Sequence, residues 1–163
     1  MAARGALGHP PLVDTADVPA WCLRRSSPAD LGWAFELHRA ALREYVEPIW
    51  GWDEELQRRL FTDGYDANSG QVIQAYGQDV GVLVVEDRAA ELYVRRIELL
   101  PAWQGKGLGT SILSSLLRRA HASGRPISLH VLKSNALAAQ LYERIGLCVV
   151  SSDTVKLAMR STP

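Results

Sequence analysis

The feature that most constrains this sequence is a glycine-rich turn, Gln104-Gly105-Lys106-Gly107-Leu108-Gly109, that separates two stretches of different periodicity. Residues 91–100 before the turn are rich in aliphatic and β-branched side chains, which is typical of a strand. After the turn, apolar residues recur at helical spacing until Gly124 and Pro126 end the pattern. The first N–H groups of such a helix have no partner within it and lie at the positive end of its dipole. The turn is therefore either a site for a phosphate group or a plain strand-to-helix connection.

Two common phosphate-binding motifs do not fit this turn. No Lys-Ser/Thr pair follows the glycines at the spacing of a Walker loop. Gly105, Gly107 and Gly109 alternate, so the G-x-G-x-x-G pattern of a dinucleotide-binding fold is absent as well. The turn must therefore belong to another kind of anion site, if it is one.

The composition indicates one globular domain without an obligatory polyanionic partner. The chain has 163 residues, of which 47% are hydrophobic, enough to build a core. Lys plus Arg and Asp plus Glu both number 18, so the formal net charge is zero and nucleic acid is not an expected partner. Cys22 and Cys148 are too few for a disulfide framework, and we expect reduced thiols that lie mostly in the core. We expect no metal site, no membrane span and no signal peptide, hence a cytoplasmic protein.

The pattern of apolar and turn residues predicts an extension followed by alternating helices and strands. Residues 1–20 contain glycines and prolines with little periodicity, and we expect a flexible N-terminal extension. Ser27 should cap a helix that ends near Val46, before Pro48, and Asp53 should cap a second helix that Gly64 ends. The predicted strands are 21–25, 71–76, 80–86, 91–100, 127–132, 147–150 and 154–159, and the later helices begin near Thr110 and Ala136.

The connection between the first two helices is unusually aromatic. Its candidate substrate-binding residues are Tyr45, Trp50, Trp52 and Asp53. These side chains could close the bottom of the core, the interpretation we prefer for Trp50. They could also form one wall of a substrate pocket suited to a cation or an amine, the interpretation we prefer for Trp52.

Two motifs in this order resemble the GCN5-related N-acetyltransferase (GNAT) superfamily. The segment Pro101-Ala102-Trp103-Gln104-Gly105-Lys106-Gly107-Leu108-Gly109 is similar to the family's pyrophosphate loop. Ser134-Asn135 with Leu141-Tyr142-Glu143-Arg144-Ile145-Gly146 is similar to its second signature. The resemblance implies an α/β (α+β) GNAT domain over residues 21–163. Its mixed sheet of about seven strands would be mostly antiparallel, with the fourth and fifth strands parallel and splayed, and about four helices would flank it.

The resemblance also implies an acetyl-CoA site and a role for each matching residue. The backbone N–H groups of residues 105–110 would hold the pyrophosphate, and residues 97–99 would pair with the pantetheine arm as an added strand does. Asn135 would contact that arm, while Tyr142 would lie near the thioester sulfur and protonate the departing thiolate. The residues assigned to the cosubstrate are Ile97, Glu98, Leu99, Gln104, Gly105, Lys106, Gly107, Leu108, Gly109, Thr110, Asn135 and Tyr142.

The sequence does not decide which group acts as the general base: His130, Glu98 or no side chain at all. An amine must lose a proton before it attacks the thioester carbonyl. His130 occupies the fifth-strand position at which relatives that acetylate a ribosomal protein N-terminus have a Glu, and it could take the proton directly or through water. Glu98, on the fourth strand beside the expected acetyl position, is the rival, and the amine could also deprotonate unaided. Packing roles are the alternatives: a core position for His130 and an ion pair with Arg95 or Arg96 for Glu98.

These inferences predict an acetyl-CoA-dependent N-acetyltransferase that moves the acetyl group directly to the amine of a small molecule. A protein N-terminal or lysine acetyltransferase is one alternative, and a non-catalytic CoA-binding sensor domain is another. The expected partners are acetyl-CoA and an amine acceptor, without nucleic acid or membrane, and a homodimer is possible.

Overall fold

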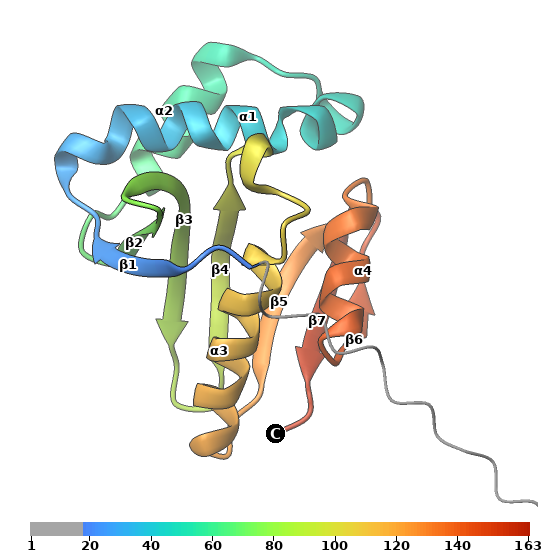
Figure 1. The fold of residues 1–163 in the computed structure, drawn as a ribbon. Coiled ribbons are helices and arrows are strands. Elements are labelled where there is room, and N and C mark those ends of the chain that lie inside the picture. The colour runs from blue at the N-terminus through green and yellow to red at the C-terminus, as the bar shows by residue number, and fades with distance from the viewer. Residues whose placement is uncertain (1–17) are drawn as a thin grey trace, which may run out of the picture.

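The computed structural model describes residues 18–163, which form a seven-stranded mixed sheet with the strand order β1-β2-β3-β4-β5-β7-β6 (Figure 1). Only β4 and β5 are parallel neighbours, as predicted. The strands are β1 (Trp21–Arg25), β2 (Gly70–Ala75), β3 (Gln78–Asp87), β4 (Leu92–Leu99), β5 (Ile127–Leu132), β6 (Leu147–Ser152) and β7 (Lys156–Ser161). The α-helices are α1 (Leu31–Trp50), α2 (Glu54–Gly64), α3 (Leu108–Ala122) and α4 (Ala136–Arg144). Of the extension predicted at residues 1–20, residues 1–17 lie outside the described part of the chain.

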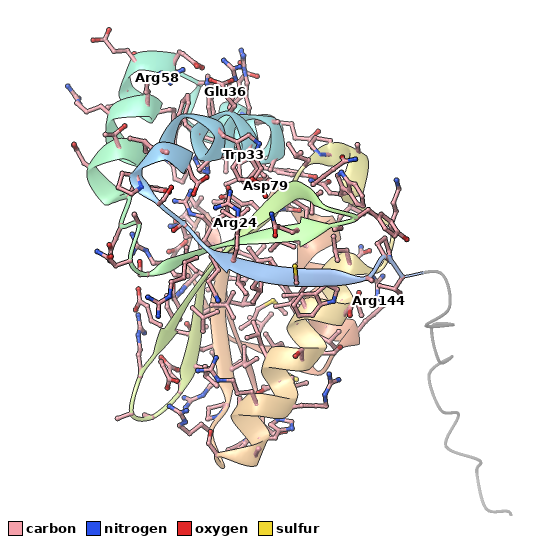
Figure 2. All side chains as sticks on the ribbon, turned by 60° about the vertical axis from the view of Figure 1, so that its left-hand side comes forward. Arg24, Trp33, Glu36, Arg58, Asp79 and Arg144 are labelled. Carbon is pink, nitrogen blue, oxygen red and sulfur yellow. The ribbon has the colours of Figure 1, made fainter. Side chains whose placement is uncertain are left out.

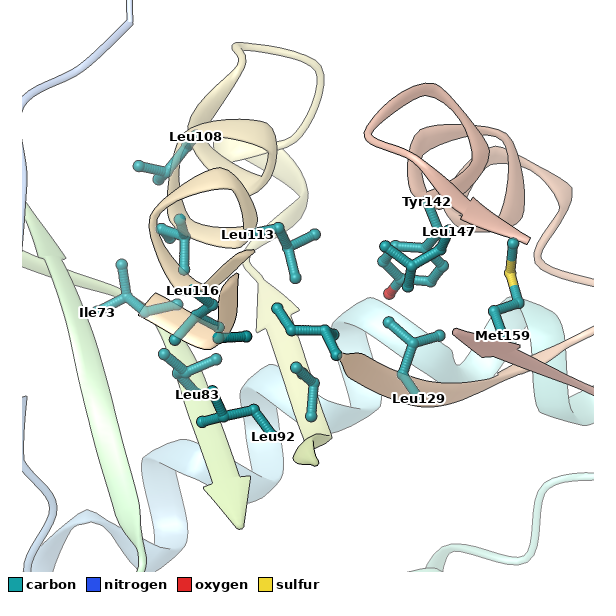
Figure 3. Packing of buried hydrophobic residues seen from close by; sticks show 14 of the residues in the cluster. Ile73, Leu83, Leu92, Leu108, Leu113, Leu116, Leu129, Tyr142, Leu147 and Met159 are labelled. Atoms are coloured by element: carbon teal, nitrogen blue, oxygen red, sulfur yellow. The ribbon is translucent and has the colours of Figure 1, made fainter. Parts of the chain in front are cut away.

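The helices cover the sheet from two sides and define two cores (Figures 1 and 3). Helices α3 and α4 bury Leu113, Leu116 and Tyr142 against strand residues such as Leu92 and Leu129. On the other face, Phe35 of α1 packs with Phe61 of α2 in a second, smaller cluster. Apolar residues at helical spacing in α3 meet alternating apolar residues in β4 and β5, so burial of both patterns stabilises this arrangement.

Strand β4 contains a bulge that changes which side chains face each core. Its pairing with β3 shifts register between Val84 and Val85, which leaves Arg95 as the extra residue. Before the bulge, Leu92 and Val94 face the larger core, the one covered by α3 and α4, which is called the α3 core below. After it, Ile97 and Leu99 face that core. Arg96 and Glu98 point instead to α1, where both lie close to the same histidine.

The start of α1 is fixed to the sheet by charged side chains. Asp30 accepts hydrogen bonds from the backbone N–H and hydroxyl of Ser27, which is the predicted capping arrangement. Arg24 of β1 contacts Asp30 at 2.8 Å and Asp79 at 2.6 Å, and Figure 2 shows Arg24 and Asp79 close together beside α1. The hydrogen bond from Arg24 lowers the pKa of Asp30 to about 2, so this carboxylate remains ionised at neutral pH. The network fixes the position of α1, which carries part of the site described below.

Two local predictions, the end of α1 and the burial of the cysteines, differ from the structure. Helix α1 does not end near Val46 but includes Pro48 and continues to Trp50. Pro48 is tolerated because it lies in the last turn, where its missing N–H costs one hydrogen bond and Gly51 still donates to Glu47 at 2.9 Å. Cys22 and Cys148 are exposed rather than buried, because they lie on β1 and β6, the two edge strands.

None of the helices in the described residues is long and apolar enough to cross a membrane.

Candidate functional site

The candidate site is an opening between β4 and β5. These strands pair only from Leu92 to Val94 and from Ile127 to Leu129, and their later residues diverge (Figure 1). Backbone N–H and C=O groups along the divergent part of β4 therefore face the opening rather than β5. Exposed strand groups of this kind can pair with an extended ligand. Residues 97–99, predicted to bind such a ligand, lie in this part of β4.

The glycine-rich turn stands at one end of this opening. Gly105 and Gly107 have positive φ angles of +70° and +77°, and the latter is the N-cap of α3. Leu108 is only 1% exposed and anchors the helix start, whereas Gln104, Gly105 and Lys106 are exposed to solvent. The turn thus presents the positive end of α3, including the backbone of Gly109 and Thr110, on an accessible surface. The Gln104 side chain donates to the Leu99 carbonyl at 2.9 Å and ties the turn to the end of β4.

Helix α4 supplies Tyr142 and Asn135 from the far side of the opening. Tyr142 is 8% exposed and packs among Leu129 and Leu147, with its hydroxyl pointing between α3 and α4 (Figure 3). Burial, and secondarily the charge of Glu98, raises the pKa of Tyr142 to about 12, so its hydroxyl keeps its proton at neutral pH. Asn135 caps α4 by accepting a hydrogen bond from Ala138 at 3.2 Å, which leaves its amide nitrogen available for a ligand.

Glu98 is buried on the α1 side of the opening in a cluster of charged and aromatic groups. It is 7% exposed, and its Oε1 lies 2.9 Å from Nδ1 of His38 on α1. Arg96 Nη1 lies 3.2 Å from the same His38 nitrogen and 3.6 Å from Glu98 Oε1. The other carboxylate oxygen, Oε2, is buried and finds no hydrogen-bond partner among residues 18–163. The charge of Glu98 is the second cause of the raised pKa of Tyr142, after burial, so the field of this carboxylate reaches the tyrosine on the other side of the opening.

His130 lies on β5 but in a different environment from the one predicted. It is exposed, not part of the core, and its Nδ1 is 3.0 Å from the Tyr93 hydroxyl. The two rings meet edge to face, with centroids 5.9 Å apart. The packing role considered for this histidine is therefore wrong, and the side chain is open to solvent at the sheet surface.

The aromatic connection divides into residues near the opening and residues away from it. Trp52 lies beside His38, with ring centroids 6.3 Å apart, and donates to Glu54 at 2.8 Å. Trp50 is 61% exposed, so the core role preferred for it is wrong. Asp53 caps α2 as predicted, accepting from Leu56 at 2.9 Å. The Tyr45 carbonyl accepts from Ser134 at 2.8 Å, which joins α1 to the loop before α4.

A sequence match to a family model, which covers most of the described chain, shows which protein family the chain belongs to. Residues 34–147 match the model of the acetyltransferase (GNAT) family, a range that includes the opening, the turn and α4. The chain belongs to this family. The resemblance seen in the two motifs is thereby confirmed, as is the expected sheet with its splayed parallel pair. A search of curated proteins found no match.

Solved structures show the same GNAT fold at low sequence identity. PaiA N-acetyltransferase from Thermoplasma acidophilum, solved in complex with coenzyme A, is 18% identical with a TM-score of 0.72, covering 88% of this chain and 99% of its own. The ribosomal-protein-S18-alanine N-acetyltransferase from Escherichia coli is 19% identical with a TM-score of 0.64, and the match covers 87% of this chain and 93% of that protein. The histone acetyltransferase HPA2 and related acetyltransferase from Corynebacterium glutamicum is 22% identical with a TM-score of 0.62. The match covers 88% of this chain and 96% of that protein. The GNAT fold binds acetyl-CoA, and the Thermoplasma structure holds coenzyme A.

In this GNAT domain, the sequence analysis missed the contribution of α1 to the site. His38 lies on an apolar helix face, so its spacing indicates packing, and nothing local reveals that it meets a carboxylate 60 residues later. The ion pair considered between Arg96 and Glu98 is present in the structure, with Nη1 3.6 Å from Oε1. The described residues contain no cluster of three or more His, Cys, Asp or Glu side chains that could hold a metal ion. The groups that the structure brings together around the opening are a buried carboxylate, a protonated tyrosine and a set of backbone donors.

Proposed function

We propose that this protein is an acetyl-CoA-dependent N-acetyltransferase that transfers the acetyl group directly to the amine of a small molecule. The observation that carries the proposal is the opening between β4 and β5, with the glycine turn at one end and Tyr142 and Glu98 on its two sides. A non-catalytic CoA-binding domain would need the turn and the free strand. It would have no need for a buried carboxylate whose charge reaches a buried tyrosine across the same space.

The residues present fit acetyl-CoA. A diphosphate would accept hydrogen bonds from the first N–H groups of α3, where the glycines remove side chains that would block its approach. The pantetheine arm contains amides that can pair with the backbone groups of residues 97–99 that face the opening, as an added strand would. Asn135 has a free amide group for the same arm, because only its oxygen is used in capping α4.

The side chains around the opening supply an acid and a base for aminolysis of a thioester. Glu98 takes a proton from the ammonium form of the acceptor, and the nitrogen lone pair that is freed attacks the thioester carbonyl carbon. A backbone N–H of β4 stabilises the negative charge that develops on the carbonyl oxygen. The C–S bond breaks and the leaving sulfur takes the hydroxyl proton of Tyr142, which is protonated at neutral pH because its pKa is about 12. The nitrogen then gives up its second proton, which restores the Tyr142 hydroxyl, and the neutral amide is formed. Glu98 is preferred to His130 because it is buried and its charge reaches Tyr142, whereas His130 is exposed.

The acceptor space favours a small amine. Trp52 and His38 form an aromatic surface next to Glu98, and an aromatic face beside a carboxylate suits a cationic amine. The hydrogen bond between Ser134 and the Tyr45 carbonyl joins α1 to the loop before α4. An acceptor space bounded by such a link would admit a small primary amine more readily than a folded protein surface.

The proposed activity is tested by mixing the protein with acetyl-CoA and a panel of primary amines and polyamines. We expect an acetylated amine and free CoA to form in equal amounts with at least one acceptor. Both products should be measured by chromatography, because the exposed Cys22 and Cys148 would react with a thiol reagent. Peptides with a free N-terminal alanine and lysine peptides serve as competing substrates. Acetylation of peptides alone would contradict the small-molecule acceptor, and no product with any acceptor would contradict the enzyme itself.

Gly107→Glu should abolish binding of coenzyme A, because it places bulk and negative charge at the proposed phosphate site. Gly124→Glu is the matched control: Gly124 also has a positive φ, +64°, but lies past the other end of α3. Calorimetric titration with coenzyme A should show binding heat for the wild type and for Gly124→Glu, and none for Gly107→Glu. Equal affinity in both variants would show that the diphosphate lies elsewhere.

Tyr142→Phe should lower kcat by on the order of 10²-fold while changing the Kd for coenzyme A less than about threefold, since it removes a proton donor and keeps the ring. The conservative change also preserves the packing of this buried side chain in the α4 core. Steady-state kinetics and coenzyme A titration on the same preparation make the comparison. A parallel loss of turnover and affinity would mean that the tyrosine supports binding and does not act as the acid.

Glu98→Gln should lower kcat/KM by on the order of 10²- to 10⁴-fold, because the amide cannot take the proton of the amine. His130→Gln, a change of similar size on the neighbouring strand, should cost less than about tenfold, because this side chain is exposed and bonded to Tyr93. Rates measured for both variants across a range of pH decide between them. The reverse order of losses would assign the base to His130, and near-wild-type rates for both would mean that the amine deprotonates unaided.

A further inference from the structure

We propose that His38 is a positioning residue for the transfer reaction: its Nδ1–H holds Oε1 of Glu98 and so directs the other oxygen, Oε2, to the acceptor amine. This inference rests on the proposed function, since it assigns a role to a residue that acts through the proposed base. The position of His38 on an apolar face of α1 would by itself indicate a packing residue. The structure brings it instead within hydrogen-bond distance of the buried carboxylate.

The contact is short and shielded from water. Nδ1 of His38 lies 2.9 Å from Oε1 of Glu98, and the two side chains are 14% and 6% exposed. A hydrogen bond with a carboxylate is stronger than one between neutral groups, and more so where water is excluded. This bond joins α1 to the divergent part of β4. It therefore fixes the carboxylate at the place where β5 no longer restrains the strand.

The neighbouring groups specify the direction of the hydrogen bond. An ionised carboxylate has no donor, so Nδ1 of His38 must carry the proton that lies between Nδ1 and Oε1. Arg96 can only donate, so it cannot share the proton of Nδ1; its Nη1 lies 3.2 Å from Nδ1 and forms an ion pair with Oε1 at 3.6 Å. His38 and Arg96 therefore both act on the same oxygen of Glu98. The negative charge of the carboxylate is balanced without either group covering Oε2.

Oε2 is left as the reactive oxygen. It is buried and has no hydrogen-bond partner within residues 18–163. An unpaired buried acceptor is unfavourable unless a ligand supplies the donor. In the proposed reaction the N–H bond of the ammonium breaks and an O–H bond to Oε2 forms, while the bond from His38 to Oε1 remains. His38 thus takes no proton itself and keeps Glu98 in the orientation that receives one.

Aromatic side chains fix the orientation of the imidazole. The His38 ring lies 4.9 Å from the ring of Phe61, 6.3 Å from that of Trp52 and 6.5 Å from that of Phe35, measured between centroids. Arg96 lies over the same Phe61 ring at 4.6 Å. A ring packed in this way loses little further freedom when it bonds to Glu98, which is what a positioning group requires. The same packing makes a purely structural role the alternative to test.

Two substitutions of His38 separate the hydrogen bond from the packing. Phenylalanine keeps an aromatic ring against Phe61 and Trp52 but has no donor, whereas asparagine loses the ring and can place its amide N–H near the position of Nδ1–H. We expect His38→Phe to lower kcat by on the order of 10- to 100-fold with little change in Tm or in affinity for coenzyme A. His38→Asn should recover at least part of the lost kcat in spite of a lower Tm. Ile73→Val, at a fully buried position on β2 away from His38, is the packing control, with a lower Tm and kcat within about threefold of the wild type.

A double variant shows whether His38 acts through Glu98. In a Glu98→Gln background, His38→Phe should cost no further activity, because the group that it positions is already disabled. A full additional loss in that background would overturn the proposal. Equal kcat for wild type and His38→Phe would overturn it as well, and so would equal losses for His38→Phe and His38→Asn.

A measurement without activity keeps this inference separate from the proposed function and does not require a folded variant at position 38. Nitrogen-15 NMR of the histidine side chains should show His38 of the wild type with its proton on Nδ1 and an Nδ1–H signal protected from exchange. Glu98→Ala should remove that protection. A proton on Nε2 alone would overturn the positioning role even if the enzyme is active. An Nδ1–H signal as expected, in a protein that transfers no acetyl group, would leave the His38–Glu98 contact intact and refute the proposed function.

Discussion

The site depends on the early end of pairing between β4 and β5. Three residue pairs join these strands, from Leu92 to Val94 on β4, and beyond them the strands diverge. A buried strand with unpaired backbone groups is costly unless something else satisfies them. Close contact with β3 maintains the course of the free part of β4: a Cβ on Gly81 would lie 2.5 Å from the Glu98 carbonyl oxygen. Because residue 81 is a glycine, β3 can pack closely against β4 on one side, while the other side of β4 faces the opening.

The bulge at Arg95 determines the chemistry of this opening. If Arg95 paired regularly with β3 and did not bulge, Glu98 would continue the alternation of Leu92 and Val94 and point into the apolar core under α3. An unpaired carboxylate in that core would be strongly destabilising. With the bulge, Ile97 fills the core and Glu98 turns to His38 on α1. One extra residue in a strand thus gives each face of the sheet its own part of the site.

The sequence predicted the order of elements well because the relevant signals are local. Alternating apolar residues gave strand β5 with its observed bounds, and the capping residues Ser27 and Asp53 marked the starts of two helices. The errors arose where position in the fold overrides local preference. Cys148 has the character of a core residue but lies on an edge strand, and Trp50 is exposed at the end of α1. Pro48 ends a helix in general, but not when it falls in the last turn.

The site was only partly predictable, because its α1 side is assembled over long sequence separations. The glycine turn and Tyr142 belong to motifs, so their residue types and spacing identified them. His38 and Glu98 are 60 positions apart, and which face Glu98 occupies depends on a bulge that has no reliable signature in a run of alternating residues. The histidine alone on an apolar face is indistinguishable from a packing residue. Three-dimensional structure was needed to show that its ring nitrogen meets a carboxylate.

The energetics of this cluster favour a functional over a structural origin. A buried carboxylate with one oxygen bonded and the other unpaired costs about 1–3 kcal/mol for the missing partner. An apolar side chain at position 98 would avoid that cost, and replacing buried ionic groups by apolar ones is often neutral or stabilising. Stability therefore does not explain why Glu98, His38 and Arg96 converge beside a buried tyrosine. A substrate amine that donates to Oε2 would satisfy the unpaired oxygen, so the group that completes the cluster is the one the proposed reaction consumes.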